Sequence, residues 1–192
     1  MKRISLALVL NLLFVCFVCG QTPASKPLDP IKDLVGLENE RAPSFSKKGM
    51  DGIDYNLADL KGKIVVVNLW GTFCEPCIAE MPKLNKLVEK FKGKDVVFLA
   101  PSPDETLLLK TFFKTRIFKY SVLPDSFDIV AQYAPKQKNT DEKGRFEMIL
   151  PTHIVIDEKG LVTKHFWGFG KNTSDILSKE ITRLLTNLQK NK

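Results

Sequence analysis

The chain has 192 residues, of which 44% are hydrophobic and 27% are charged, so it is long enough to bury the core of one globular domain. The formal net charge is +7, because 29 Lys and Arg outnumber 22 Asp and Glu. The basic residues are scattered along the chain, which favours a solvated surface over a nucleic-acid interface. We therefore expect no nucleic-acid partner.

The first twenty residues have the composition of an export signal. Two basic residues precede a largely apolar run over residues 4–18, which is short for a membrane span. We predict that residues 1–20 form a secretory signal that is cleaved before Gln21. Two alternatives stay open: lipid attachment at Cys16 or Cys19, as in a bacterial lipoprotein, or an uncleaved membrane anchor. The protein is expected to be exported to the periplasm or the extracytoplasmic face, with membrane contact only through a lipid or an anchor.

The remaining chain divides into a spacer and one folded domain. Residues 21–40 are rich in Pro, Lys and Asp and are predicted to form the spacer, and residues 41–192 are predicted to form the domain. The domain is expected to open with a short N-terminal hairpin around a turn at 49–52, followed by a helical turn over 57–60.

A buried strand followed by an amphipathic helix comes next. Residues 64–70 read IVVVNLW, a β-branched apolar run typical of a strand that is covered on both faces. Apolar residues then recur at helical spacing, which predicts a helix over residues 75–92 that ends at Gly93.

Short strands and helices alternate along the second half of the chain. Ser102, Pro103 and Glu105 form a helix-start pattern with Ser102 as the N-cap. The order of elements predicts an α/β fold, with a mixed central sheet flanked by helices on both faces and an insertion between its two halves. The expected elements are a strand over 96–100, a helix from 103 to 116, a strand over 118–122, a helix over 127–133, a charged loop over 136–147, strands over 152–156 and 161–167, and a helix from about residue 173.

Cys74 and Cys77 form a Cys-x-x-Cys motif, WGTFCEPC, at the junction of the first buried strand and its helix. Cys74 is expected at the helix N-terminus, where unpaired N–H groups and the helix dipole favour a thiolate. Cys77 is expected one turn inside, close enough to resolve a mixed disulfide. Half of a zinc site is the alternative, but no second cysteine or histidine pair completes one. The motif therefore predicts a redox dithiol without a metal.

Cleavage of the signal would leave these two cysteines alone in the chain. A bond between them closes a very short loop and constrains the unfolded chain little, so reactivity explains the pair better than stability does. The sequence has no Gly-rich phosphate loop, so neither a flavin nor a nucleotide is expected as a cofactor. We expect the dithiol itself to carry the electrons by thiol-disulfide exchange.

Two segments, VVVNLWGTFCEPCIAEMP and LPTHIVIDEKG, together resemble the TlpA/ResA branch of exported thiol-disulfide oxidoreductases. The stretch from APSF to LADLKGK is similar to the redoxin-type N-terminal extension of that branch, so the resemblance covers roughly residues 41–190. It implies a thioredoxin-like fold and protein disulfides or thiols as substrates, with apocytochrome c as one example. It also implies a membrane-embedded thiol-transfer protein as electron donor.

The resemblance assigns roles to residues that match the motifs of the family. Cys74 would attack, Cys77 would resolve, and the two would form a disulfide in the oxidised state. Pro151 would be a cis-proline beside the dithiol that helps hold an extended substrate strand. Trp70 would pack under the active site. The further residues expected at the substrate-binding surface are Phe73, Pro76, Leu150 and Thr152.

The direction of electron flow depends on the charge beside Cys74. Glu75 places a negative charge next to the nucleophile, which disfavours the thiolate and partly offsets the helix N-terminus. We therefore assign Glu75 a part in catalysis and expect a reductase. The opposing interpretation is that Glu75 points into solvent and is screened.

Three residues near the motif leave open questions. Asn68 stands where thioredoxin itself has an acidic proton acceptor, and Asn cannot act as a base. Glu80 is the nearest candidate in sequence for a proton relay to Cys77, but it is expected to lie on the helix surface. His153 could join the cysteines as a copper ligand, although a strand histidine that packs or hydrogen-bonds is the favoured interpretation. His165, in a strand expected to be exposed, receives no role.

Two other functions compete with the reductase. A copper-handling module would use the cysteine pair and His153. A thiol peroxidase is suggested by the redoxin-like front end. Its peroxidatic cysteine usually has a threonine three positions before it, and this chain has Gly71 there. Phe73 also departs from the family, which usually has tryptophan there. The loop over 136–147 could contribute to the choice of partner.

Overall fold

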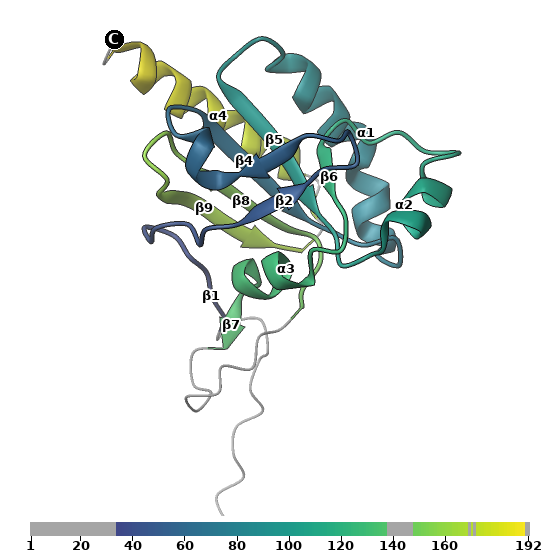
Figure 1. Ribbon diagram of the computed structural model, residues 1–192. Coiled ribbons are helices and arrows are strands. Elements are labelled where there is room, and N and C mark those ends of the chain that lie inside the picture. Colours follow the sequence, from purple (N-terminus) through teal and green to yellow (C-terminus); the bar gives the residue numbers. More distant parts are fainter. Residues whose placement is uncertain (1–33, 138–147, 169, 171, 191–192) are drawn as a thin grey trace, which may run out of the picture.

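The computed structural model describes residues 34–137, 148–168, 170 and 172–190. The predicted export signal and most of the predicted spacer lie outside these residues. A five-stranded sheet with the order β6-β5-β4-β8-β9 forms the centre (Figure 1). The pairs β4–β5 and β5–β6 are parallel, whereas the pairs β4–β8 and β8–β9 are antiparallel, so the mixed sheet is confirmed. The strands are β4 (Ile64–Leu69), β5 (Val96–Pro101), β6 (Ser121–Leu123), β8 (Thr152–Ile156) and β9 (Val162–Trp167).

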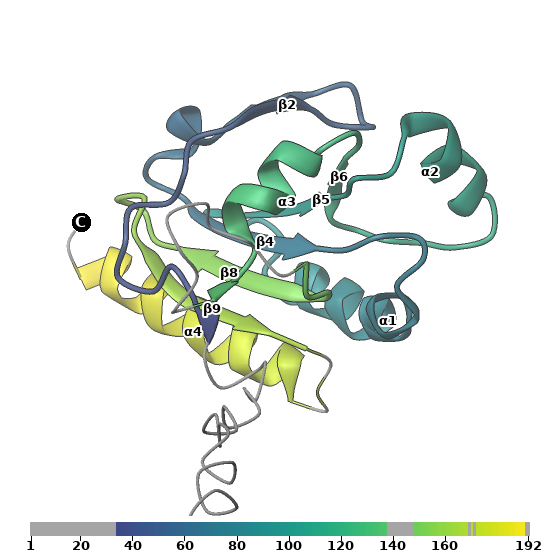
Figure 2. The same ribbon diagram turned by 90° about the horizontal axis from the view of Figure 1, so that it is seen from below.

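Helices cover both faces of this sheet, as predicted (Figure 2). Two long helices, α1 (Glu75–Lys90) and α4 (Thr173–Lys190), lie on one face, and α3 (Phe127–Tyr133) lies on the other. All six side chains of β4 are buried because alternate residues point into the cores on opposite faces. Burial on both faces explains the continuous apolar run in the sequence.

The helix that carries the cysteine pair begins and ends close to the predicted positions. Cys74 is its N-cap, and Pro76 occupies the first turn, where a missing N–H has no cost. The helix ends at Lys90, and Gly93 follows with a φ of 75°, a left-handed conformation that glycine adopts without strain.

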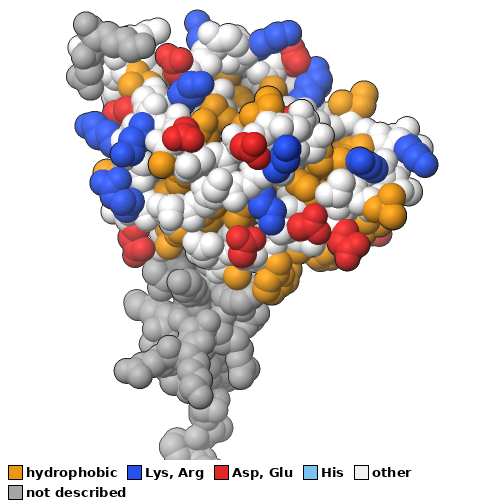
Figure 3. All heavy atoms as spheres, viewed as in Figure 1, with side chains coloured by type: hydrophobic (Ala, Val, Ile, Leu, Met, Phe, Trp, Pro, Cys, Tyr) orange, Lys and Arg blue, Asp and Glu red, His pale blue; other side chains and the backbone are white. Residues whose placement is uncertain are grey.

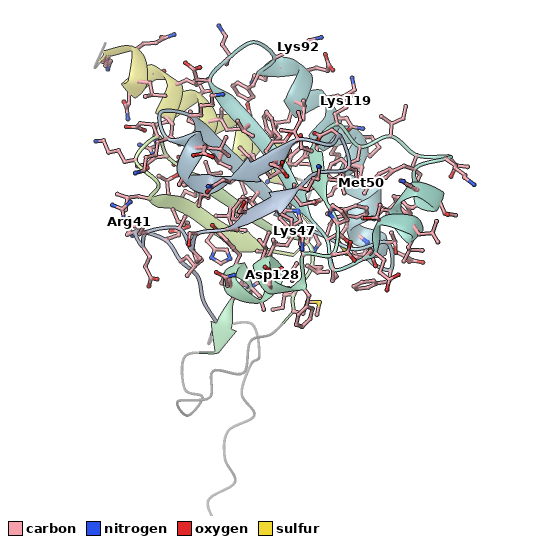
Figure 4. The ribbon with its side chains drawn as sticks, viewed as in Figure 1. Arg41, Lys47, Met50, Lys92, Lys119 and Asp128 are labelled. Atoms are coloured by element: carbon pink, nitrogen blue, oxygen red, sulfur yellow. A yellow bond between two sulfur atoms is a disulfide. The ribbon has the colours of Figure 1, made fainter. Side chains whose placement is uncertain are left out.

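A separate hairpin, β2 (Ser46–Lys48) with β3 (Asp54–Asn56), precedes a 3-10 turn, η1 (Leu57–Leu60). Both were predicted. Lys47 of the hairpin approaches the carboxylate of Asp128 in α3 to 4.0 Å, so the hairpin packs beside the α3 face (Figure 4).

The segment that precedes the hairpin in sequence lies beside β9. The N–H of Asn39 donates to the carbonyl of Val162 at 2.8 Å, and the N–H of Val162 donates to Glu40 at 2.9 Å. A further pair of short strands, β1 (Leu34–Val35) and β7 (Lys136–Gln137), links this stretch to the segment after α3. The predicted loop over 136–147 therefore begins as a short strand, and its residues 138–147 lie outside the described residues.

The predicted helix start at Ser102 is wrong. Helix α2 spans Thr106–Phe112, with Glu105 as an N-cap that makes no side-chain cap bond. The N–H of Ser102 instead donates to the carbonyl of Leu123 at 2.9 Å, which holds this residue beside the sheet. The hydroxyl of Ser102 bonds locally to Asp104, which belongs to the turn before the helix, so the capping pattern does not start the helix here.

The strand predicted over 118–122 is also displaced, because β6 begins at Ser121 where it pairs with Leu99 of β5. In the residues before β6, the aromatic rings of Phe118 and Tyr120 stack on each other, with centroids 4.8 Å apart.

Charged side chains of both signs are interspersed over the surface in Figure 3, and no single basic patch dominates that face. Within the described ranges, no helix has the length and apolar character needed to cross a membrane.

Candidate active site

Cys74 and Cys77 are joined by a disulfide at the N-terminus of α1, and both side chains are buried. The N–H of Cys77 donates to the Sγ atom of Cys74 at 3.3 Å. A hydrogen bond to this sulfur favours its negatively charged form once the disulfide is reduced. The start of α1 thus supplies a hydrogen-bond donor to the sulfur of Cys74.

Pro151 lies beside the cysteine-bearing junction. The Leu150–Pro151 peptide bond is cis, and β8 starts at the next residue. Because Thr152 pairs with Leu69, the last residue of β4, Pro151 lies opposite the point where the chain leaves β4 for Cys74. Thr152 is buried and donates through Oγ1 to the carbonyl of Ile149 at 2.6 Å.

Trp70, four residues before Cys74, is packed in the core. Its side chain is fully buried, and Nε1 donates to the carbonyl of Ala100 at 3.3 Å. Rings of Phe112, Phe113 and Phe118 surround it with centroid distances of 5.4–5.8 Å. Full burial leaves Trp70 no surface for direct contact with a partner.

An exposed aromatic ring stands next to the nucleophile. Phe73 is 64% exposed, and Glu75 and Pro76 are exposed as well, whereas Leu150 is half-buried. The ring of Phe73 lies over Gly71, where an added Cβ would come within 2.6 Å of it. Gly71 therefore makes room for the ring.

A buried aspartate, which sequence reasoning missed, holds the loop before Cys74. The N–H of Thr72 donates to Oδ2 of Asp104 at 2.6 Å, and the hydroxyl of Ser102 donates to the same atom at 3.0 Å. No local pattern could have identified this bond, because it joins segments 32 residues apart.

Three polar side chains meet in the core below the cysteine pair. Glu80 is 2% exposed, so the expectation of a helix-surface carboxylate is wrong. Its Oε1 lies 3.3 Å from Nδ2 of Asn68 and 3.2 Å from Nε2 of His153. We name Asn68, Glu80 and His153 the buried polar cluster.

The favoured interpretation of His153, a strand residue that packs and hydrogen-bonds, is confirmed. Its ring stacks on that of Phe166, with centroids 5.0 Å apart, and its Nδ1 lies 3.0 Å from Nδ2 of Asn68. Over the described residues, no three Cys, His, Asp or Glu side chains gather as a metal site would need.

Two further titratable groups are buried. Burial, together with the charge of Glu80, raises the pKa of Tyr120. His165 is 5% exposed, so its expected exposure is wrong. It accepts a hydrogen bond at Nδ1 from the N–H of Leu37 at 2.7 Å, and burial lowers the pKa of His165 to about 4 against the opposing charge of Glu38.

A Cys-x-x-Cys disulfide at a helix start, beside a cis-proline on a mixed sheet flanked by helices, defines a thiol-disulfide oxidoreductase of the thioredoxin-like fold. The chain belongs to the AhpC/TSA family, whose model matches residues 39–165, and within it to the ResA-like thiol-disulfide oxidoreductases.

Sequence relatives support this assignment over most of the chain. The protein is 36% identical over 163 residues to the thiol-disulfide oxidoreductase ResA of Bacillus cereus, covering 83% of this chain and 86% of that protein. It is 33% identical over 136 residues to the thioredoxin-like protein YneN of Bacillus subtilis, covering 68% and 72%.

Solved structures agree on the fold. A thioredoxin-family thiol:disulfide interchange protein from Chlorobium tepidum matches with a TM-score of 0.60 and 25% identity, over 76% of this chain and 95% of that chain. The exposed lipoprotein thioredoxin Etrx1 from Streptococcus pneumoniae matches with a TM-score of 0.58 and 25% identity, over 74% and 100%.

Proposed function

We propose that the protein works as a reductase of protein disulfides outside the cytoplasm. The proposed direction of electron flow rests on the charge at the start of α1. Glu75, the first residue of the helix, is exposed and acidic, and no basic residue stands between the cysteines. Its negative charge disfavours the Cys74 thiolate, which makes the reduced dithiol a better electron donor.

The proposed cycle uses groups already described. The thiolate of Cys74 attacks a partner disulfide and forms a mixed disulfide with it. Cys77 then attacks the Sγ atom of Cys74, which releases the reduced partner and restores the Cys74–Cys77 disulfide. In this cycle an extended partner segment would pass the exposed ring of Phe73 to reach Cys74, and we assign the cis-proline Pro151 a part in holding it.

Cys77 must lose a proton before it attacks, and Glu80 is the group we assign to take it. The two residues are three positions apart on α1, so their side chains lie on the same helix face. Oε2 of Glu80 makes no hydrogen bond to the described residues and is available as an acceptor. Asn68 cannot take this part because an amide has no basic group.

The reduction potential of the Cys74–Cys77 couple tests the direction. It is measured by equilibration of the protein lacking residues 1–20 against glutathione or dithiothreitol. A value near that of thioredoxin, about −270 mV, would support the reductase. A value near about −120 mV would make the protein an oxidant and overturn the proposal.

A substrate assay tests the partner class. We expect the reduced protein to reduce an oxidised Cys-x-x-Cys-His peptide of the apocytochrome c type, and to be recharged by a membrane-embedded thiol-transfer protein. Faster consumption of peroxide than of any disulfide would favour the thiol peroxidase instead.

The proposed location rests on residues 1–20 and on the likeness to an exposed lipoprotein thioredoxin. The mass of the N-terminal peptide from protein made in its host tests it. A mature terminus at Gln21 would support cleavage, and a lipid on Cys16 or Cys19 would support a tether to the membrane. An intact terminus in the cytoplasmic fraction would contradict export.

A further inference from the structure

Three parallel strands of the central sheet end at the edge where the dithiol lies. The N–H of Trp70, just after β4, donates to the carbonyl of Pro101, the last residue of β5, at 3.4 Å. The N–H of Ser102 donates to the carbonyl of Leu123, the last residue of β6, at 2.9 Å. The segments that follow the three strands therefore leave the sheet side by side. They are the loop before Cys74, the turn before α2 and the turn before α3.

Asp104 bonds these segments to one another. Its Oδ2 accepts from the N–H of Thr72 at 2.6 Å, and its carbonyl accepts from the N–H of Asp125 at 2.9 Å. The hydroxyl of Thr106, the first residue of α2, donates to Oδ2 of Asp125 at 3.3 Å. The start of α2 is thus held next to the loop that carries Phe73 and the nucleophile.

Helix α2 buries one side and exposes two leucines on the other. Leu109 is fully buried, and the ring of Phe112 packs on that of Trp70 with centroids 5.4 Å apart. Leu107 and Leu108, in contrast, are 76% and 49% exposed. Apolar side chains that gather in water beside a reactive group mark a surface for a partner.

Exposed acidic side chains lie along the same edge. Glu75 is the first residue of α1, and Glu105 is the N-cap of α2 but makes no side-chain cap bond. Figure 3 shows hydrophobic and acidic side chains together along the lower right edge of the molecule, which is the edge where β4, β5 and β6 end in Figure 1. Lys47 and Lys110 line a separate hollow with Asp125, between the β2–β3 hairpin and α2. A partner segment that is both apolar and basic would complement this edge.

We propose that Phe73, Leu107 and Leu108 form one docking surface, which we name the α2 shelf. It binds an apolar and basic segment of the partner polypeptide, beside the disulfide that Cys74 attacks. This inference rests on the proposed function, in which the partner is a protein disulfide. A partner whose sulfur reaches Cys74 passes the adjacent ring of Phe73, and the two leucines extend that contact onto α2. The α2 shelf selects partners by the residues that flank their cysteines, and it adds no step to thiol-disulfide exchange.

Two matched peptides test the α2 shelf. Both contain an oxidised Cys-x-x-Cys-His loop, extended at each end by Leu-Lys-Leu-Lys in one and by Ser-Lys-Ser-Lys in the other. The measured quantity is the second-order rate constant with which each peptide oxidises the reduced protein, followed by rapid quench, alkylation and mass spectrometry. We expect the leucine peptide to react about tenfold faster than the serine peptide with the wild-type protein, which corresponds to about 1.4 kcal/mol of binding.

Replacement of both leucines, by Leu107→Ser with Leu108→Ser, should bring the ratio of the two rate constants close to one. Ile117→Ser is the matched control and should keep the wild-type ratio. Ile117 is 73% exposed but lies beyond the far end of α2, where its carbonyl accepts from Nδ2 of Asn85 at 2.8 Å. If the double variant does not fold, as judged by urea unfolding, Leu107→Ser alone replaces it, since Leu107 is the more exposed of the two leucines.

A third peptide, with Leu-Glu-Leu-Glu extensions, tests the charge of the partner segment. It should react about threefold more slowly than the Leu-Lys-Leu-Lys peptide at low salt, because Glu75 and Glu105 repel it. The difference should shrink at high salt, where exposed charges are screened. A glutamate peptide that reacts as fast as the lysine peptide, or faster, would contradict the assignment of a basic partner.

Equal rate constants for the leucine and serine peptides with the wild-type protein overturn the inference, and so does a ratio that the double variant keeps. A wild-type dimer in sedimentation that the double variant abolishes also overturns it, because a second copy would then cover the α2 shelf. A wild-type protein that none of the peptides oxidises refutes the proposed function instead, so the two failures are distinguishable.

Discussion

The backbone N–H of Thr72 donates a 2.6 Å hydrogen bond to the carboxylate of Asp104, which ties the loop before Cys74 to the segment after β5. The loop that leads into the helix of the two cysteines is therefore bonded to the segment that follows β5. Asp104 is buried, and the hydroxyl of Ser102 holds its carboxylate in turn. The nucleophile is positioned by this chain of bonds as well as by its own helix.

Asp104→Ala should loosen this loop. The variant leaves a partly buried N–H without its acceptor, and we expect a loss of about 1–3 kcal/mol in the free energy of unfolding. Urea unfolding of the oxidised protein measures it. Asp104→Asn, which keeps an acceptor oxygen, should lose clearly less. Equal unfolding free energies for Asp104→Ala and the wild-type protein would contradict the assigned role.

Gly71→Ala should displace the ring of Phe73, because the new Cβ would come within 2.6 Å of it. The ring is exposed and free to turn, so stability should change by less than about 1 kcal/mol. The loss of an ordered aromatic surface should raise KM for a protein disulfide about fivefold, as expected for about 1 kcal/mol of binding, with a small disulfide unaffected. Phe73→Ala is the comparison variant. The prediction fails if KM rises equally for both substrates.

Glu75→Gln should make the couple more oxidising. Removal of the negative charge at the start of α1 favours the Cys74 thiolate. Because the group is exposed, we expect the reduction potential to rise by about 10–30 mV, which corresponds to at most a tenfold change in the thiol-disulfide exchange equilibrium. Glu75→Lys should shift the potential further in the same direction. The effect should shrink at high salt, because exposed charges are screened. A potential that does not move at low salt would refute the electrostatic argument for a reductase.

Stability should fall on acidification because of His165. The pKa is about 4 in the folded protein and 6.5 in the unfolded chain, so the unfolded state binds more protons between these values. The stabilisation is therefore fully present above about pH 6.5 and is lost as the pH falls towards 4, by about 3 kcal/mol at most. Urea unfolding at several pH values measures this loss.

His165→Asn separates this effect from the titration of carboxylates. Asparagine can accept from the N–H of Leu37 but does not titrate, so the part of the pH dependence between the two pKa values should disappear. If the variant and the wild-type protein lose the same stability over this range, His165 is not its source.

The strand and helix around the cysteine pair were predictable because their signals are local. The run over 64–69 is buried on both faces, and α1 follows it with Cys74 as its cap. Asp104 and Glu80 were not predictable in this way. Each is a polar residue whose partner lies on another element, and periodicity contains no information about such partners.

Ser102 is the opposite case: its local sequence pattern predicted a helix start that the structure does not have. Its side chain bonds to Asp104 and its N–H donates to Leu123, and the helix starts three residues later than predicted, at Thr106. His165 was misjudged for a related reason. The alternation of its strand does not reveal that the stretch over 37–41 covers it.

That covering stretch has a consequence for how copies of the protein behave towards each other. In the described part of the chain, β9 is an outer strand of the central sheet, and an outer strand offers unpaired N–H and C=O groups to any other strand. Asn39 and Glu40 pair with Val162 and so occupy the end of that edge where β9 begins. The protein thereby presents less free edge for the edge-to-edge association that leads to aggregation.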